Sequence, residues 1–197
     1  RTVTRATGRT VARTVVADWL VRLRPHLADG ELRILTRALA DAVQDLQQGV
    51  ADFAILYHHP SLTVPLDGRQ FLHVALATDR LLPIALADAH GAPRYRLGAG
   101  STAVPYIAFG RTLALGRLVE DLLAHHPQAS SLQRLVECDS PDANYEYVRK
   151  GLGVSWLPWS MVHGDCKSGL LAPAGDKSLE VKFDVRLYRP KRRLSTL

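Results

Sequence analysis

The 197-residue chain carries 25 Lys and Arg against 19 Asp and Glu, a formal net charge of +6, and 47% of its residues are hydrophobic. This composition is typical of a globular protein with one domain or two small ones. Charged residues interrupt every apolar run before it reaches the roughly 20 residues that a membrane-spanning helix needs. Two cysteines, Cys138 and Cys166, are too few for a disulfide framework or a metal site. We therefore expect a cytoplasmic protein without a metal or another cofactor.

The positive charge is concentrated in two places. Arginines are scattered along the first predicted helix, and the segment PKRRL occupies residues 190–194. An excess of positive charge favours anionic partners. The sequence has no basic stripe interleaved with aromatic residues of the kind that binds single-stranded nucleic acid. We interpret most of these arginines as exposed, solubilising charge.

In chain order, the first half predicts a strand, a helix, a strand, a helix and a strand. The segment TVTR is β-like, and ATGRTVA (6–12) leads from it into an amphipathic helix predicted over residues 10–24. The segment 31–56 then predicts a strand at Leu32–Leu35, a helix that ends at Gly49, and another strand. The apolar face predicted for the first helix consists of Val11, Val15, Leu20, Leu23 and Leu27.

The second half repeats this order. AFGRTLA (108–114) matches ATGRTVA at five of seven positions and follows the β-like segment PYI. The helix after it has an apolar face, and the segment 131–157 again predicts strand, helix, glycine and strand. Gly8 to Gly49 and Gly110 to Gly151 are both 41 positions apart. The repeat predicts two α/β halves of the same architecture.

The stretch ECDSPDANYEYVRKGLGVSWLP (137–158) predicts a strand–helix–strand unit. Ser140 is a good N-cap, Gly151 suits a left-handed helix stop, and Leu152–Leu157 predicts a buried strand. Units of this kind bind ligands at the carboxyl ends of their strands. That position is held here by Cys138, Asp139 and Ser140.

Two further segments connect the halves. Gln70–Leu76 and Arg80–Leu86 predict one or two strands that leave the first half, and Val181–Tyr188 predicts a strand that crosses back. The Gly-, Ala- and Pro-rich segment 89–105 is a connecting stretch. We therefore expect an α/β fold of two Rossmann-like subdomains joined by two crossing strands, with a ligand cleft between them.

The expected boundaries place the first subdomain at 1–80 and the second at 81–180. Residues 181–197 form the crossing strand and a C-terminal segment that returns to the first subdomain.

The chain resembles the effector-binding domain of LysR-type transcriptional regulators. The resemblance is carried by GVADFAIL (49–56), GLGVSWLP (151–158), KSGLL (167–171) and FDVRLYR (183–189), and it covers nearly the whole chain. It implies a fold like that of type II periplasmic binding proteins, with a small-molecule effector in the inter-subdomain cleft. Within the family, GRLVEDLL (116–123) is similar to the branch that includes hypochlorite-responsive regulators.

The resemblance also implies partners. DNA would be bound only through an N-terminal winged helix-turn-helix domain and linker helix outside this chain. The domain would form a homodimer or tetramer, and the helix 10–24 is a candidate contributor because Trp19 and its neighbours enlarge its apolar face. No contact with a membrane is expected.

Both GRT tripeptides, Gly8–Thr10 and Gly110–Thr112, are predicted at strand-to-helix junctions, where free N–H groups and the helix dipole attract anions. An arginine there has a fork suited to carboxylates. We therefore expect an anionic effector. The alternative is that Thr10 and Thr112 cap helices while Arg9 and Arg111 point to solvent. The candidate effector-binding residues are Thr7, Gly8, Arg9, Thr10, Thr36, Arg37, Phe109, Gly110, Arg111, Thr112, Asp139 and Ser140.

Three alternatives stay open from the sequence. Cys138 is a possible redox sensor, since Met161 is the only methionine, although a lone cysteine is more often a small buried hydrophobe. A free-standing solute-binding protein would share the fold, but the N-terminal segment lacks the apolar core of a signal peptide. It also lacks an initiator Met, which suggests a piece of a longer protein. An enzyme is disfavoured because HExxH, GxSxG and paired CxxC motifs are absent.

Overall fold

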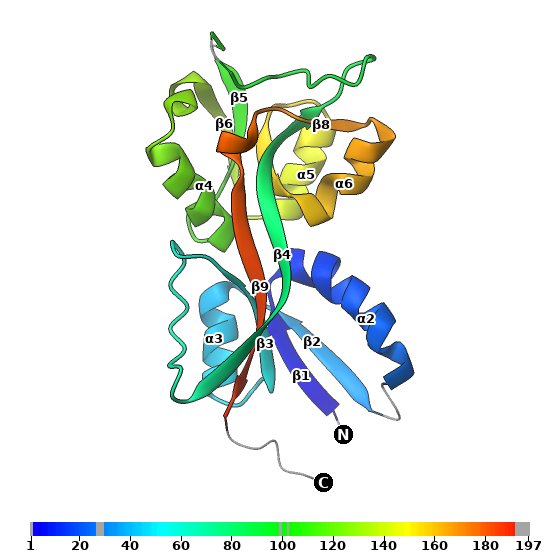
Figure 1. Cartoon of the computed structure of the whole chain (residues 1–197), viewed down its shortest axis with the longest axis vertical. Helices are drawn as coiled ribbons and strands as arrows, with labels where there is room; N and C mark the ends of the chain where they lie inside the picture. The colour runs from blue at the N-terminus through cyan, green and yellow to red at the C-terminus, as the bar shows by residue number, and fades with distance from the viewer. Residues whose placement is uncertain (1, 27–29, 99, 102, 192–197) are drawn as a thin grey trace. The chain divides into compact units, whose positions relative to one another are not determined.

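The computed structural model describes residues 2–26, 30–98, 100–101 and 103–191, and the chain divides into two compact units (Figure 1). Unit 1 consists of Arg1–Thr78 and Phe183–Leu197, and unit 2 of Asp79–Lys182. The chain passes between the units within β4 (Phe71–Leu86) and again within β9 (Val181–Pro190). The predicted α/β fold class, with two subdomains joined by two crossing strands, is confirmed. Leu27 and most of the PKRRL segment lie outside the described residues.

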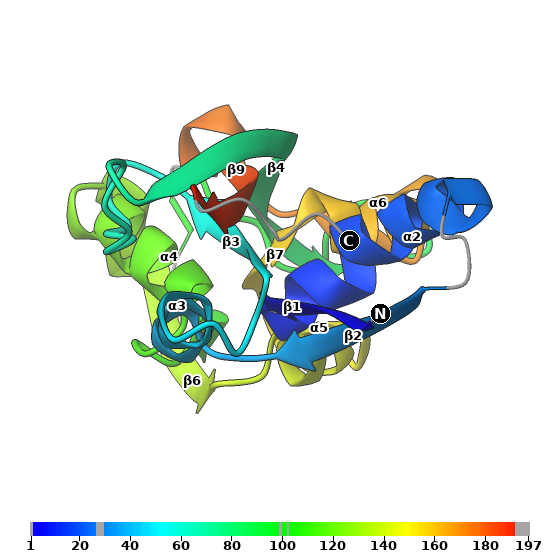
Figure 2. The ribbon, with the colours of Figure 1, turned by 90° about the horizontal axis from the view of Figure 1, so that it is seen from below.

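Unit 1 is built on parallel strands. Its remaining elements are β1 (Thr2–Thr7), a helical segment made of α1 (Arg9–Val11), a π-helical turn (Ala12–Val16), α2 (Ala17–Leu23) and a 3₁₀ turn (Arg24–His26), then β2 (Glu31–Thr36), α3 (Leu39–Gln47) and β3 (Phe53–His58). The strand order β2-β1-β3-β9-β4 places β1 parallel to both β2 and β3, and β9 antiparallel to β3. Figure 2 shows β1 beside β2.

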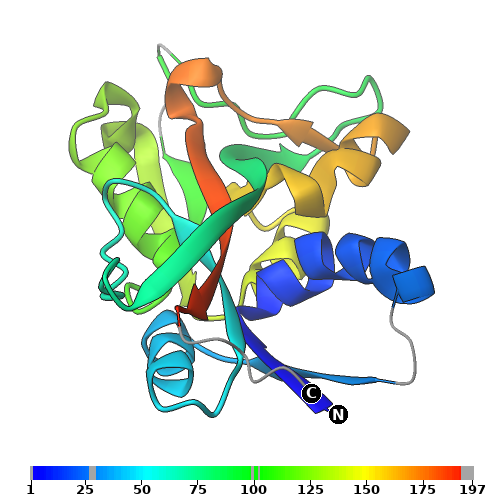
Figure 3. The ribbon, with the colours of Figure 1, turned by 60° about the horizontal axis from the view of Figure 1, so that its bottom comes forward.

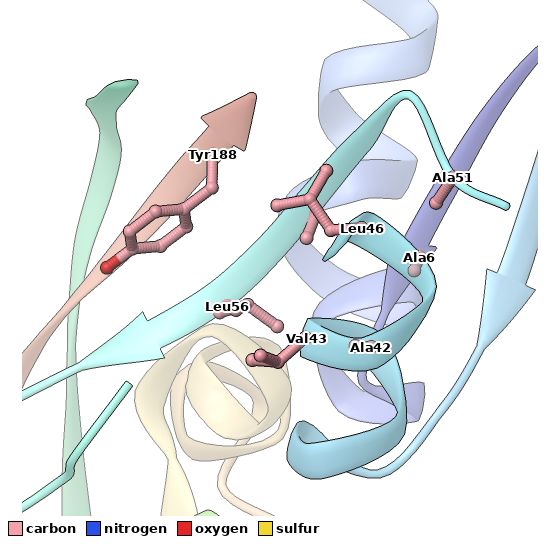
Figure 4. Packing of buried hydrophobic residues seen from close by; sticks show 8 residues of the cluster. Ala6, Ala42, Val43, Leu46, Ala51, Leu56 and Tyr188 are labelled. Carbon is pink, nitrogen blue, oxygen red and sulfur yellow. The ribbon is translucent and has the colours of Figure 1, made fainter. Parts of the chain in front are cut away.

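The core of unit 1 lies between α3 and the sheet. Leu46 of α3 packs with Ala6 of β1, Leu56 of β3 and Tyr188 of β9 (Figure 4). Side chains alternate across a strand, so Arg5, next to Ala6, points to the opposite face. There the guanidinium lies 4.0 Å from the ring centre of Trp19 in α2. The sheet therefore has α3 on one face and the α1–α2 segment on the other (Figure 3).

The predicted apolar face of the first helix is wrong in part. Val11, Thr14 and Val16 are buried, and Val15 is only half-buried. The reason is the π-helical turn, which shifts the buried face along the sequence. Within it, the Thr14 hydroxyl donates to the Thr10 carbonyl oxygen at 2.8 Å, a contact that often bends helices.

Unit 2 repeats the order of unit 1. Its elements are β5 (Val104–Phe109), α4 (Ala114–Ala124), a 3₁₀ turn (Pro127–Ser131), β6 (Leu132–Cys138), α5 (Pro141–Arg149), β7 (Ser155–Pro158), α6 (Trp159–Ser168), β8 (Leu171–Pro173) and a 3₁₀ turn (Lys177–Leu179). β5 is parallel to β6, and the later residues of β4 pair antiparallel with β7 and β8. Gly49 and Gly151 both follow a helix with a positive φ, 75° and 79°, as the matched spacing predicts.

None of the described helices combines the length and the apolar character that crossing a bilayer requires.

The segment before β7 approaches β5 so closely that only glycine fits. The Val154 N–H donates to the Pro105 carbonyl oxygen at 2.8 Å, and the Ile107 N–H donates to the Val154 carbonyl oxygen at 2.8 Å. A Cβ added at Gly153 would lie 2.4 Å from the Pro105 carbonyl oxygen, which is backbone and cannot swing away.

We expect Gly153→Ala to lower the free energy of unfolding by about 1–3 kcal/mol, because the methyl group forces β5 and β7 apart. Gly164→Ala is the matched control. Gly164 lies within α6 and its added Cβ meets nothing within 4 Å, so this change should leave stability equal or raise it by up to about 1 kcal/mol. Urea denaturation measures both, and equal stability of the two variants would contradict the close approach.

Candidate functional site

In unit 1, the parallel strands bring two groups of predicted site residues together. Thr7 and Thr36, the last residues of β1 and β2, are opposite each other in the register. The Arg37 N–H donates to the Thr7 carbonyl oxygen at 2.8 Å. Thr7 itself is fully buried, and its hydroxyl donates to the Ile55 carbonyl oxygen at 3.0 Å. Thr7 therefore fixes the sheet edge, while Thr36 and Arg37 are exposed there.

The helix after β1 begins without a side-chain cap. Gly8 is its N-cap residue, and the Gly8 carbonyl oxygen accepts from the Ala12 N–H at 2.9 Å. Thr10 is 4% exposed and lies inside the helix, so the alternative that it caps the helix is wrong. Arg9 is exposed and pairs with no carboxylate among the described residues. The first N–H groups of this helix thus lack a side-chain acceptor, and a free guanidinium lies beside them.

Arg37 is less available to a ligand than Arg9. Its Nε lies 3.0 Å from Asp45 Oδ2 of α3, in an ion pair at the protein surface. The ion pair connects Arg37, which follows β2, to α3. It also offsets part of the positive charge at this edge.

In unit 2, Phe109 and Asp139 flank the corresponding edge. Phe109 is opposite Cys138 in the β5–β6 register, and the Gly110 N–H donates to the Cys138 carbonyl oxygen at 2.9 Å. A Cβ added at Gly110 would lie 3.5 Å from the Cβ of Asp139. The structure therefore brings Gly110 and Asp139 together. Phe109 is only 2% exposed and belongs to the core.

The second GRT tripeptide does not begin a helix. Arg111 and Thr112 lie in an exposed turn closed by the Leu113 N–H, which donates to the Gly110 carbonyl oxygen at 3.1 Å. α4 starts only at Ala114, after the N-cap Leu113, so the alternative that Thr112 caps it is wrong. Helix and turn touch closely here: a Cβ at Gly116 would lie 2.4 Å from the Gly110 carbonyl oxygen. Arg111, like Arg9, pairs with no carboxylate within the described part of the chain.

Ser140 is the N-cap of α5, as predicted. Its Oγ accepts from the Ala143 N–H at 3.3 Å, and Pro141 occupies the first helical position. The exposed Asp139 precedes the cap. A structural role thus accounts for Ser140, and a contact with effector stays a prediction.

Sequence reasoning missed a buried polar pair beneath the unit 2 edge. Asn144 of α5 is fully buried, and its Nδ2 donates to the Ala108 carbonyl oxygen at 3.2 Å. The Ser155 hydroxyl, 3.5 Å from the same nitrogen, donates to the Ile107 carbonyl oxygen at 2.8 Å. Asn144 shares the inward face of α5 with Val148, at the helical spacing of four, and this spacing was the signal available in the sequence.

Arg5 was also missed. Burial lowers its pKa, and its Nε and Nη1 are buried without a hydrogen-bond partner among the described residues. Besides Trp19, the ring of Phe53 lies 5.4 Å from the guanidinium carbon. A charged residue within a segment predicted as a strand was the available signal.

The cysteines are both free and half-buried. Cys138 ends β6, and Cys166 lies in α6, where burial raises the pKa of its thiol. Within the described residues, no group of three or more His, Cys, Asp or Glu side chains is arranged to hold a metal ion.

We expect Ser140→Ala to lower the free energy of unfolding by about 1 kcal/mol, since the Ala143 N–H loses its acceptor. Ser140→Asp should keep most of the stability because a carboxylate caps a helix start equally well. Thermal or urea unfolding of the two variants provides the measurement. Equal losses in both would show that Ser140 acts through something other than the cap.

A sequence profile of one family, the LysR substrate binding domain, matches residues 2–197. The HTH-type transcriptional regulator YjiE of Escherichia coli K12 is 25% identical over 156 residues, which are 79% of this chain and 49% of YjiE. The matched region thus spans about half the length of that relative.

Two solved structures have a similar fold. The regulatory domain of HypT from Salmonella typhimurium, bound to a bromide ion, is 21% identical with a TM-score of 0.83, over 100% of this chain and 89% of that one. Full-length HypT is described as a hypochlorite-specific LysR-type transcriptional regulator. DarR from Vibrio fischeri, in complex with DNA, is 21% identical with a TM-score of 0.81, over 98% of this chain and 63% of that one.

Proposed function

Because this chain belongs to the LysR substrate binding domain family, we propose that it senses a small anionic effector for a transcriptional regulator. The observation that carries the anionic effector is a pair of exposed arginines at the carboxyl ends of the parallel strand pairs β1–β2 and β5–β6. Arg9 follows β1 and Arg111 follows β5, and neither has a carboxylate partner in the described part of the chain.

The surroundings of each arginine support an anion rather than a neutral ligand. Beside Arg9, the helix begins with N–H groups that no side chain caps. Beside Arg111, the Gly110 N–H is bound to the Cys138 carbonyl oxygen, so the backbone of the turn that carries the Arg111 guanidinium is held in place. Asp139, a carboxylate at the unit 2 edge, is exposed and would orient an amine or hydroxyl of the effector. The bromide bound by the HypT domain is consistent with an anion on this fold.

The signal would reach DNA through a population shift. An effector that binds one conformation of the domain more tightly raises the fraction of that conformation. A winged helix-turn-helix domain in the longer protein would then change its placement on an operator, and the DarR–DNA complex supports this part of the proposal. The inter-subdomain cleft, the cytoplasmic location and the absence of a cofactor stay predictions.

A thermal-shift screen tests the anion. Small carboxylates, aromatic acids and inorganic anions are titrated against the chain, because a ligand that binds only the folded form raises the apparent stability. We expect at least one anion to give a saturable thermal shift. Arg9→Ala or Arg111→Ala should weaken the affinity for that anion at least about tenfold, since a charge-assisted fork contributes roughly 1.5–3 kcal/mol. The controls Arg33→Ala in β2 and Arg117→Ala in α4 remove exposed arginines that lie elsewhere.

The combined Arg9 and Arg111 variant tests whether the two arginines are coupled. A loss in the double variant that differs from the sum of the single losses shows energetic coupling between them, which supports one shared ligand. No shift with any anion, together with an oxidation response that Cys138→Ser abolishes, would replace the proposal by redox sensing.

We also propose that α2 mediates self-association. None of its residues is buried, although four of its seven are large and apolar, and Val21 is 76% exposed. A helix with this composition normally covers or is covered by another surface.

Val21→Glu should shift the chain toward monomer, with a dissociation constant raised at least about tenfold, because a carboxylate would be desolvated in the contact. Sedimentation velocity over a concentration series measures this. Val74→Glu, which places the same charge at another exposed valine (54% exposed), is the control. An identical response of both variants would exclude α2 as the specific contact.

A further inference from the structure

Four titratable or charged side chains of unit 1 gather where the chain leaves this unit. His58 ends β3, Asp184 and Arg186 lie on β9, and His73 lies on β4. The register places His58 opposite Asp184, and β9 is the neighbour of β4 in the sheet. We call these four residues the exit cluster. None of them belongs to the two sheet edges described above.

Asp184 is the centre of the exit cluster. Its Oδ2 lies 3.8 Å from His58 Nδ1 and 3.4 Å from Arg186 Nη2, and its Oδ1 accepts from the Thr78 hydroxyl at 3.5 Å. All three distances exceed those of strong charge-assisted hydrogen bonds, so the carboxylate is shared among weak contacts. Thr78 is the last residue of unit 1 on β4, and Asp184 is the second residue of unit 1 on β9. One carboxylate therefore connects both crossing strands at the unit boundary.

The arginine disfavours the protonated form of His58. Arg186 Nη1 lies 3.4 Å from His73 Nε2, and because a guanidinium only donates, this nitrogen must accept. Burial lowers the pKa of His58, and Arg186, His73 and His59 lower it further, while Asp184 opposes them. These groups come from β9, β4 and the residue after β3. His58 therefore gains its proton at a lower pH than an ordinary histidine does.

We propose that the exit cluster is a proton-operated control on the crossing strands, in which a protonated His58 forms a closer ion pair with Asp184 and draws the carboxylate away from Thr78. The step moves one proton from solvent to His58 and breaks no covalent bond. Thr78 is followed by Asp79, whose Oδ1 accepts from the Ser160 N–H at 3.2 Å at the start of α6. Release of Thr78 would therefore act on its neighbour in the chain, Asp79, which binds the start of α6 in unit 2. The proposal does not depend on the effector.

The direction of the pH effect follows from the lowered pKa. The unfolded chain binds the His58 proton more readily than the folded one, so stability rises with pH. The contribution is fully present above the ordinary histidine value of 6.5, and it is lost as the pH falls through the lower folded-state pKa.

A nuclear magnetic resonance titration of the ¹⁵N-labelled chain, from about pH 8 to about pH 5, tests the proposal. We expect the amides of Thr78 and Asp184 to shift with the midpoint of the His58 ring, below 6.5. His58→Gln should abolish this shared shift. His59→Gln is the control: His59 Nδ1 accepts from the Ser61 N–H at 3.0 Å, and no contact with Asp184 is found among the described residues. The shared shift should persist in this variant with a raised midpoint, because His59 lowers the pKa of His58. Asp184→Asn should lower the His58 midpoint, since it removes the group that raises it.

The proposal would be overturned if the His58 ring titrates while the amide chemical shifts of Thr78 and Asp184 do not change. Amide shifts that persist in His58→Gln would also overturn it. If that variant does not fold, the unaltered chain still decides, because the ring and the two amides must share one midpoint.

Discussion

The parallel pairing of β1 with β2, and of β5 with β6, is the constraint on which the candidate site depends. Parallel strands must end at the same edge, so the residues that follow them meet there regardless of their separation in the sequence. The Arg37 N–H on the Thr7 carbonyl and the Gly110 N–H on the Cys138 carbonyl are the bonds that close the two edges. Each hydrogen bond closes the turn that follows the last residue pair of its two strands. The backbone that carries the exposed side chains is therefore held in place.

The same edges are supported from beneath by polar groups with little freedom. The Thr7 hydroxyl and the Asn144 amide each donate to a strand carbonyl in a fully buried setting. A buried donor that loses its acceptor costs about 1–3 kcal/mol, so these contacts resist rearrangement. A conformational change is therefore expected to alter the weak contacts of Asp184 on β4 and β9 more readily than the two sheet edges.

The sequence predicted the parts of the fold that local chemistry determines. The Ser140 cap, the glycine stops at Gly49 and Gly151 and the repeated order of elements depend on residues close together in the chain, and all are confirmed. The apolar face of the first helix was wrong because the Thr14–Thr10 contact lies within a π-helical turn, which a regular 3.6-residue period does not reveal. The two GRT tripeptides share letters but not structure: the first begins a helix, whereas the second lies in a turn before α4. Arg5 and Asn144 left only a weak local signal, and the exit cluster left none, because its residues meet only when β3, β4 and β9 become neighbours.

The π-helical turn at Ala12–Val16 has a consequence for how this chain is compared with its relatives. Such a turn accommodates about one residue more than an α-helix would over the same length. Deleting one residue there would restore a regular α-helix, so the residues that follow, Trp19 included, would keep their direction toward Arg5. A one-residue gap in a sequence alignment therefore belongs inside this helix. A relative with that gap is expected to be able to keep the contact between the arginine and the tryptophan.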